Sequence, residues 1–177
     1  MKYELSALLV IASVLATSTG CGTAPASSSQ LSMLAANIDA SQFKLAEEPD
    51  GAVGVIAARE LAEDGSPLVL VGRIGGSATP WIEGRAAFTL LDASMNVVAE
   101  GDDRAEGEIC TGDCCATERL NCTTLVKVVD EHGQIVPVDS RQLLGLKESD
   151  LVVVQGTAKK DGNGNFVMLA RGVFIRN

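Results

Sequence analysis

Short runs of β-branched and other apolar residues recur between positions 68 and 175, separated by glycine, asparagine and aspartate. Runs of this length with turn-forming residues at their ends are typical of β-strands. The pattern predicts five strands, at residues 68–74, 87–91, 123–130, 151–158 and 166–175. A shorter apolar run at 135–138 is expected to return against the third strand.

Two helices are predicted beside these strands. Apolar residues recur at helical spacing through 52–62, where Asp50 is placed to cap the first turn. Asp139 with Gln142 three residues later has the pattern of a capping box, which predicts a short helix between strands three and four. The segment 93–121 between strands two and three is long, acidic and rich in cysteine.

The order of these elements predicts the fold class. Three strands, a short helix and two more strands follow one another as in the OB-fold, a five-stranded Greek-key barrel. We therefore expect a mainly β chain with an OB-fold-like barrel and an N-terminal helix. A short helix should lie between strands three and four, and a long cysteine-bearing insertion between strands two and three.

Residues 47–177 also resemble a group of exported bacterial OB-fold lipoproteins. The resemblance is carried by the N-terminal helix, the Gly-rich first strand around Gly72, the cysteine-bearing insertion and the Val-Val-Asp sequence that ends at Asp130. It implies a barrel fold and a location outside the cytoplasm, and it implies no assigned chemistry.

The first twenty residues have the pattern of a secretory signal. Lys2 precedes an apolar run over 5–16, and small residues lead to Gly20 and Cys21. A short charged start, about 7–15 apolar residues and a small-residue site are typical of such signals. The apolar run is shorter than the about 20 residues that span a bilayer. Because it ends on Gly-Cys, the segment resembles a bacterial lipoprotein signal, in which the cysteine is acylated, for example with palmitate, and becomes the N-terminus.

The predicted organisation has three parts: a signal peptide at 1–20, a lipidated N-terminus and flexible tether at 21–50, and the barrel domain at 51–177. We expect an exported protein, lipid-anchored through Cys21 to a cell membrane and facing the periplasm or the cell exterior. Secretion without a lipid and an uncleaved anchor are the alternatives.

Charge and composition restrict the partners. The formal net charge is −9, and only 3% of the residues are aromatic. A negative chain with few aromatic residues repels phosphate backbones and offers few stacking platforms, so we expect no nucleic-acid partner. Attachment to the membrane should depend on the lipid, and an envelope protein or glycan is the expected partner.

Four cysteines remain if Cys21 is acylated, an even number that favours disulfides in an exported protein. They are Cys110, Cys114, Cys115 and Cys122, spaced C-x3-C-C-x6-C. Adjacent cysteines pair only with strain. Two pairings then remain: Cys110–Cys114 with Cys115–Cys122, or Cys110–Cys115 with Cys114–Cys122.

Other roles for these four cysteines stay open. Four thiolates could hold zinc or an iron–sulfur cluster, although the spacing departs from the usual C-x2-C hooks. A thiol-redox role is a further alternative, but the nearby Glu108, Asp113 and Glu118 would raise a thiol pKa and so reduce the reactive thiolate. We expect no cofactor, with zinc or iron–sulfur as the alternative.

Outside the cysteines, chemistry-bearing motifs are few. His132 is the only histidine, which gives little support to a catalytic triad, so we expect no catalytic residues and no enzyme. Trp81 lies between strands one and two, in a loop that borders the ligand face of OB domains, with Arg73 and Arg85 near it in sequence. These three residues are the candidate ligand face, although Trp81 could instead complete the core.

The function expected from these features is a non-catalytic binding module for a protein, a glycan or a small molecule. A metal-binding or thiol-redox protein that uses the cysteine cluster is the alternative. An OB-type barrel does not decide between them, because this fold has many functions.

Overall fold

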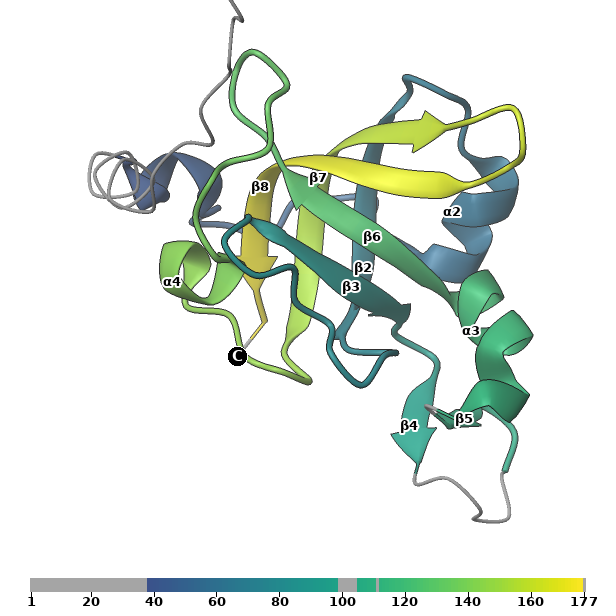
Figure 1. Cartoon of the computed structure of the whole chain (residues 1–177). Helices are drawn as coiled ribbons and strands as arrows, with labels where there is room; N and C mark the ends of the chain where they lie inside the picture. The colour runs from purple at the N-terminus through teal and green to yellow at the C-terminus, as the bar shows by residue number, and fades with distance from the viewer. Residues whose placement is uncertain (1–37, 99–104, 111, 177) are drawn as a thin grey trace, which may run out of the picture.

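The computed structural model describes residues 38–98, 105–110 and 112–176 (Figure 1). The predicted signal peptide, Cys21 and the first part of the predicted tether lie outside these residues. The side chain of Cys114 is also not described.

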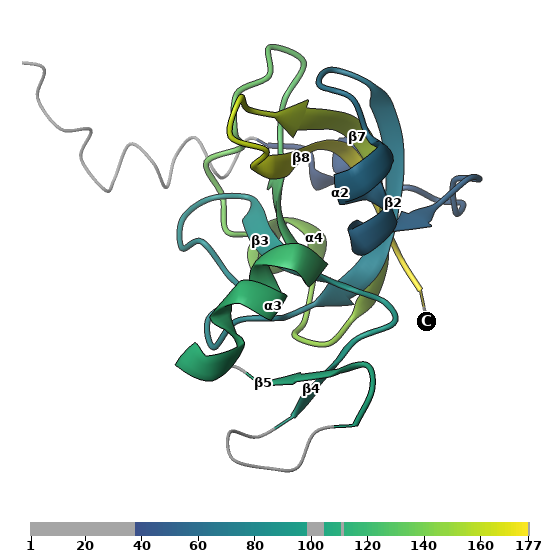
Figure 2. The ribbon, with the colours of Figure 1, turned by 90° about the vertical axis from the view of Figure 1, so that its right-hand side faces the viewer.

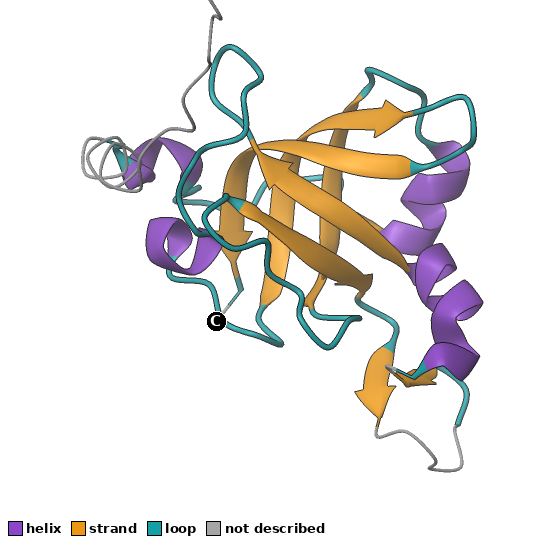
Figure 3. Ribbon diagram, viewed as in Figure 1, coloured by secondary structure: helices purple, strands orange, loops and turns teal. Residues whose placement is uncertain are grey.

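Five strands close into a barrel, so the chain is mainly β as predicted (Figures 1 and 3). They are β2 (Pro67–Ile74), β3 (Ala87–Asp92), β6 (Thr123–Val128), β7 (Leu151–Lys160) and β8 (Phe166–Ile175). The strands neighbour one another in the order β2-β3-β6-β8-β7, and β7 pairs again with β2. Only β6 and β8 run parallel within this barrel; its other pairings are antiparallel. Each lies at or within a few residues of a predicted strand.

The predicted return strand at 135–138 is reduced to a single bridge between Val129 and Ile135. The backbone N–H of Val136 also donates to the carbonyl of Val128, 3.0 Å away. This segment therefore leads from β6 to the next helix without adding a strand to the barrel.

Glycine permits close approach of strands at the bend between β7 and β8. The register of this pair shifts between Gln155 and Gly156. A Cβ atom on Gly156 would overlap the carbonyl oxygen of Leu169 and approach the Cα atom of Ala170. Such a bulge bends a strand and increases its local twist, which helps the sheet to close.

The barrel interior is mostly aliphatic and also contains phenylalanine. Fully buried side chains from the barrel strands include Leu70, Phe88, Val126, Val154 and Met168. Two further short elements contribute to this core. The 3-10 helix η1 (Ala40–Phe43) adds Phe43, and the helix α4 (Ser140–Leu144) adds two leucines.

The N-terminal helix α2 (Val55–Leu61) is shorter than predicted and has a different cap. The prediction that Asp50 caps this helix was wrong. The N-cap residue is Gly54, the last residue of the short strand β1 (Val53–Gly54), and glycine has no side chain that could accept a hydrogen bond. The carboxylate of Asp92 at the end of β3 takes this role, accepting a hydrogen bond of 2.9 Å from the backbone N–H of Ile56. A cap can thus come from a strand distant in sequence.

Asp92 is almost completely buried, with 5% of its surface exposed. Its other oxygen accepts hydrogen bonds from the backbone N–H and the hydroxyl of Ser94, at 2.9 and 2.6 Å. Burial by itself would raise the pKa of the carboxyl, but the hydrogen bonds from Ser94, Ile56 and Val55 outweigh burial and hold the pKa below its usual value.

The long segment between β3 and β6 is ordered in its described parts. It contains β4 (Asn96–Val98), β5 (Glu108–Cys110), the 3-10 helix η2 (Asp113–Cys115) and α3 (Ala116–Cys122). Figures 1 and 2 show that α3 lies beside α2 at one end of the barrel, and that β4 and β5 extend beyond it.

A second, smaller core holds this insertion together. Its buried members come from β3 and from the insertion: Leu91, Ile109, Cys110, Cys115 and Cys122. The side chains of Met95 and Val98 pack against them. The sequence predicted chemical roles for these cysteines, but here they are also buried packing residues, because a buried cysteine behaves as a small apolar side chain.

No helix among the described residues combines the length and the apolar character needed to cross a bilayer.

Replacing the buried capping carboxylate should destabilise the fold. We expect Asp92→Asn to lower the free energy of unfolding at pH 7 by about 1–3 kcal/mol, because hydrogen bonds to a buried charged acceptor are weakened. Since the pKa of Asp92 is lowered on folding, its contribution is present above the usual carboxyl pKa and is lost as the pH falls through the lowered value. The gap between variant and wild type should therefore narrow below about pH 4.

Denaturant unfolding followed by circular dichroism at several pH values measures this difference. Asp50→Asn is the matched control, because Asp50 is exposed and caps nothing. Equal losses of stability in the two variants would contradict the assignment of Asp92 as the cap.

Candidate functional site

A pocket of about 330 Å³ lies where β2 leaves the barrel. Its lining comes from three parts of the chain: the end of β2 and the following Gly-rich turn, the end of β3 with the start of the insertion, and the loop before β7. The lining residues are Arg73–Ala78, Leu91, Met95–Val97 and Glu148–Ser149. We call this cavity the Arg73 pocket.

Two buried polar atoms in the Arg73 pocket lack a hydrogen-bond partner within the described residues. They are the Nε atom of Arg73 and the hydroxyl oxygen of Ser77. No acidic side chain in the described ranges forms an ion pair with Arg73. A buried polar group without a partner costs about 1–3 kcal/mol, so native proteins rarely leave one in place without a reason.

The backbone around the Arg73 pocket is fixed by contacts between β2 and the loop before β7. The N–H of Ile74 donates to the carbonyl of Asp150, and the N–H of Ser149 donates to the carbonyl of Ile74, both at 2.9 Å. Ser149 has φ of +68°, the only positive value at a described residue other than glycine. Strain of this kind concentrates at binding sites, where surrounding contacts hold it in place.

The insertion and the strand before it provide much of the apolar wall. Met95 and Val97 belong to it, and Leu91 lies on the strand from which it departs. The exposed carboxylate of Glu148 lies at the edge. The pocket therefore combines hydrogen-bond donors, an apolar wall and one peripheral acid, as ligand sites commonly do.

The three residues of the predicted ligand face do not all line this pocket. Arg73 lines it, whereas Trp81 and Arg85 are absent from its lining. The Trp81 backbone forms an isolated bridge with Phe88, and the centroids of their rings lie 6.4 Å apart. Trp81 packs against the main core, and the guanidinium of Arg141 lies 5.5 Å from its ring centroid. This placement matches the alternative in which Trp81 completes the core.

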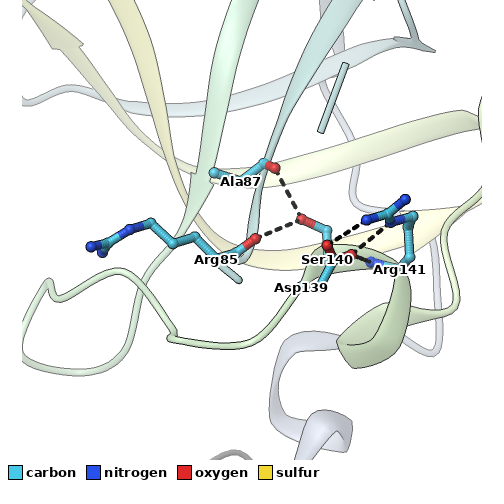
Figure 4. A network of polar contacts seen from close by, with 5 residues as sticks. All are labelled: Arg85, Ala87, Asp139, Ser140 and Arg141. Carbon is cyan, nitrogen blue, oxygen red and sulfur yellow. Dashed lines mark hydrogen bonds and ion pairs between the residues drawn. The ribbon is translucent and has the colours of Figure 1, made fainter. Parts of the chain in front are cut away.

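A polar network that includes Arg141 joins α4 to β3 (Figure 4). Asp139 caps α4 as predicted, accepting from the backbone N–H of Arg141 at 2.9 Å and from its guanidinium at 2.8 and 2.7 Å. The side-chain and backbone hydrogen bonds from Arg141 hold the pKa of Asp139 below its usual value, although burial opposes this. The hydroxyl of Ser140 donates to the carbonyl of Ala87 at 3.2 Å. In Figure 4 the Arg85 guanidinium points away from this network.

The structure brings three of the four predicted cysteines into one buried cluster. The sulfur atoms of Cys110 and Cys115 lie 2.6 Å apart, and these residues are 2% and 0% exposed. Cys122 is 3% exposed and packs in the same core. The side chain of Cys114 lies outside the described residues, so its predicted pairings stay predictions.

The surroundings of Cys122 disfavour its thiolate. Burial raises the pKa of this thiol, and the nearby charges of Asp92 and Glu118 raise it further. Glu118 therefore raises the pKa of the Cys122 thiol, as predicted from the sequence. Although three cysteines share one apolar core, no group of three His, Cys, Asp or Glu residues in the described part of the chain is arranged so that it could hold a metal ion.

The residues that sequence analysis missed are Ser77 and the loop residues Glu148 and Ser149. The Gly75-Gly76 pair before Ser77 marked a sharp exit from the strand, but no local pattern placed the loop before β7 against it. Only barrel closure brings these segments together.

Comparison with protein-family models gives no match for this chain, and comparison with curated proteins gives no significant match.

If Trp81 completes the core, shortening its side chain should cost stability. We expect Trp81→Ala to lower the free energy of unfolding by about 2–4 kcal/mol through lost packing against Phe88. Ile82→Ala, at a neighbouring residue that is 43% exposed, is the control and should change stability little. Denaturant titration measures both, and an unchanged Trp81→Ala midpoint would refute the core assignment.

Proposed function

We propose that this chain is an exported, lipid-anchored envelope protein. Its OB-fold-like barrel would act as a non-catalytic binding module for a small molecule at the Arg73 pocket. The single observation that carries the binding proposal is the pair of buried polar atoms on Arg73 and Ser77 that lack partners in a pocket of suitable size.

The strand order supports the OB-fold-like assignment. If β2, β3, β6, β7 and β8 are numbered one to five, the neighbours run one-two-three-five-four, and strand four closes on strand one. Strands three and five are parallel, and α4 lies between strands three and four. This order is the one expected of a five-stranded Greek-key barrel of the OB type, and it therefore supports the proposal.

The pocket chemistry favours a ligand that carries a carboxylate or similar oxyanion. The guanidinium of Arg73 and the hydroxyl of Ser77 can both donate hydrogen bonds, and a guanidinium has no acceptor. Leu91, Met95 and Val97 favour a short apolar group on the same ligand. Since the net charge of the chain is −9, affinity for an anion should depend on these local donors.

The sequence supports the proposed location through the signal-like segment that ends at Cys21. Acylation of Cys21 would hold an otherwise negative protein at a membrane surface. A thiol-redox function is the second candidate, and the short distance between the sulfur atoms of Cys110 and Cys115 favours it.

The binding proposal is tested with hexanoate as the probe and hexanamide as its neutral analogue. We expect saturation-transfer NMR to detect hexanoate on the wild type and to give a much weaker signal with hexanamide. Arg73→Met should weaken hexanoate binding roughly 10–100-fold, because a hydrogen bond to a charged partner is lost.

Arg85→Met is the matched control, since it removes an exposed arginine that does not line the pocket. It should bind hexanoate as the wild type does. Equal binding by all three proteins, or no binding to the wild type, would contradict the proposed site.

The anchor is tested by substitution of the predicted acylated residue. Cys21→Ser should move the protein from the membrane fraction to the soluble fraction of cell lysates, because the lipid would be the main attachment. Cys114→Ser controls for loss of a cysteine as such and should stay with the membrane. Fractionation with immunodetection measures this, and a Cys21→Ser protein that still sediments with membranes would count against the lipid anchor.

A further inference from the structure

The sulfur atoms of Cys110 and Cys115 lie at the ends of two adjacent elements. Cys110 is the last residue of β5, and Cys115 is the last residue of η2. Their Sγ atoms are 2.6 Å apart, longer than the about 2.05 Å of a disulfide but close enough that only a small movement would join them.

The backbone between these cysteines is held independently of the sulfur atoms. The guanidinium of Arg119 on α3 donates hydrogen bonds to the carbonyls of Cys110 and Gly112, at 2.9 and 2.5 Å. The N–H of Cys115 donates to the same Gly112 carbonyl, 3.2 Å away. These contacts hold Cys110, Gly112 and Cys115 close together without a bond between the two sulfur atoms.

We propose that Cys110 and Cys115 form a disulfide in the mature protein and that this bond fixes the insertion. Of the two pairings left open by the sequence, the geometry points to the one that contains Cys110–Cys115. Because both side chains are buried in the fold, the bond forms while the insertion is still folding.

The chemistry is thiol–disulfide exchange with a protein or low-molecular-weight disulfide as the oxidant. One thiolate attacks the oxidant to form a mixed disulfide and releases one of its thiols. The second cysteine then attacks its partner's sulfur, which releases the other thiol of the oxidant. The new S–S bond replaces two S–H bonds, and the two electrons and two protons leave on the reduced oxidant.

The bond has a mechanical consequence for the wall of the Arg73 pocket. Cys110 lies opposite Val98 in the parallel pair of β4 and β5. Residues 95–97, which line the pocket, lie at the start of β4 and directly before it. A bridge from β5 to η2 therefore anchors the short sheet that carries this wall, whether or not the pocket binds a ligand.

Peptide mapping of protein purified from the cell envelope without reductant tests the pairing. After alkylation in denaturant, cleavage at arginine and lysine and before Asp113 should leave peptides 105–112 and 113–119 joined by a disulfide. Tandem mass spectrometry should place the link on Cys115. The Cys114→Ser variant should keep this link, and Cys115→Ser should lose it.

Stability provides a second measurement. A reductant should lower the thermal unfolding midpoint of the wild type by roughly 4–8 °C. Cys114→Ser, which cannot form the companion Cys114–Cys122 bridge, should still show a decrease, and Cys110→Ala/Cys115→Ala should show a smaller decrease than the wild type. If that double variant does not fold, the mapping of wild-type protein still decides the pairing.

Alkylation of Cys110 without prior reduction would overturn the proposal, and so would a link from Cys110 to Cys114 or Cys122. Neither result would bear on hexanoate binding at Arg73. The two proposals can therefore fail separately.

Discussion

The carboxylate of Asp92 is buried where the second barrel strand, the N-terminal helix and the insertion meet. One oxygen accepts a hydrogen bond from the backbone N–H of Ile56 in the first turn of α2, and the other accepts two from Ser94, where the insertion starts. Gly54 is required beside it, since a Cβ atom there would lie 2.6 Å from the carboxylate oxygen. A charge this deeply buried is tolerated only because its hydrogen bonds replace those of water. Asp92 therefore ties the start of α2 to the end of β3 and to the first turn of the insertion.

The Arg73 pocket follows from the way in which the barrel is built. Strand β2 pairs on one side with β3 and on the other with β7, and the two pairings end at its C-terminal end. The glycine turn after β2, the insertion after β3 and the loop before β7 therefore converge at one point. At this point the side chains of Arg73 and Ser77 each keep a buried polar atom without a hydrogen-bond partner among the described residues. Loops on a rigid scaffold are common places for binding residues for this reason.

Sequence patterns predicted the barrel strands well because each is a short apolar run between turn residues. Local rules also found the Asp139 cap, which acts within its own helix. They failed for Asp92, because this cap acts on a helix 36 residues earlier in the chain. The same limit applies to Ser77 and Ser149, which become neighbours only through barrel closure. No helix or strand was predicted in the insertion, because its small core consists largely of cysteines, which pack as apolar side chains once buried.

The position of β8 restricts when the barrel can form. This strand lies between β6 and β7 in the barrel and pairs with both of them. Without residues 166–175, the other four barrel strands could pair only as an open sheet with two unpaired edges. The closing contacts are also distant in sequence, a feature that slows folding. A chain that lacks β8 therefore cannot close this barrel, and it would expose two strand edges to pairing with other chains.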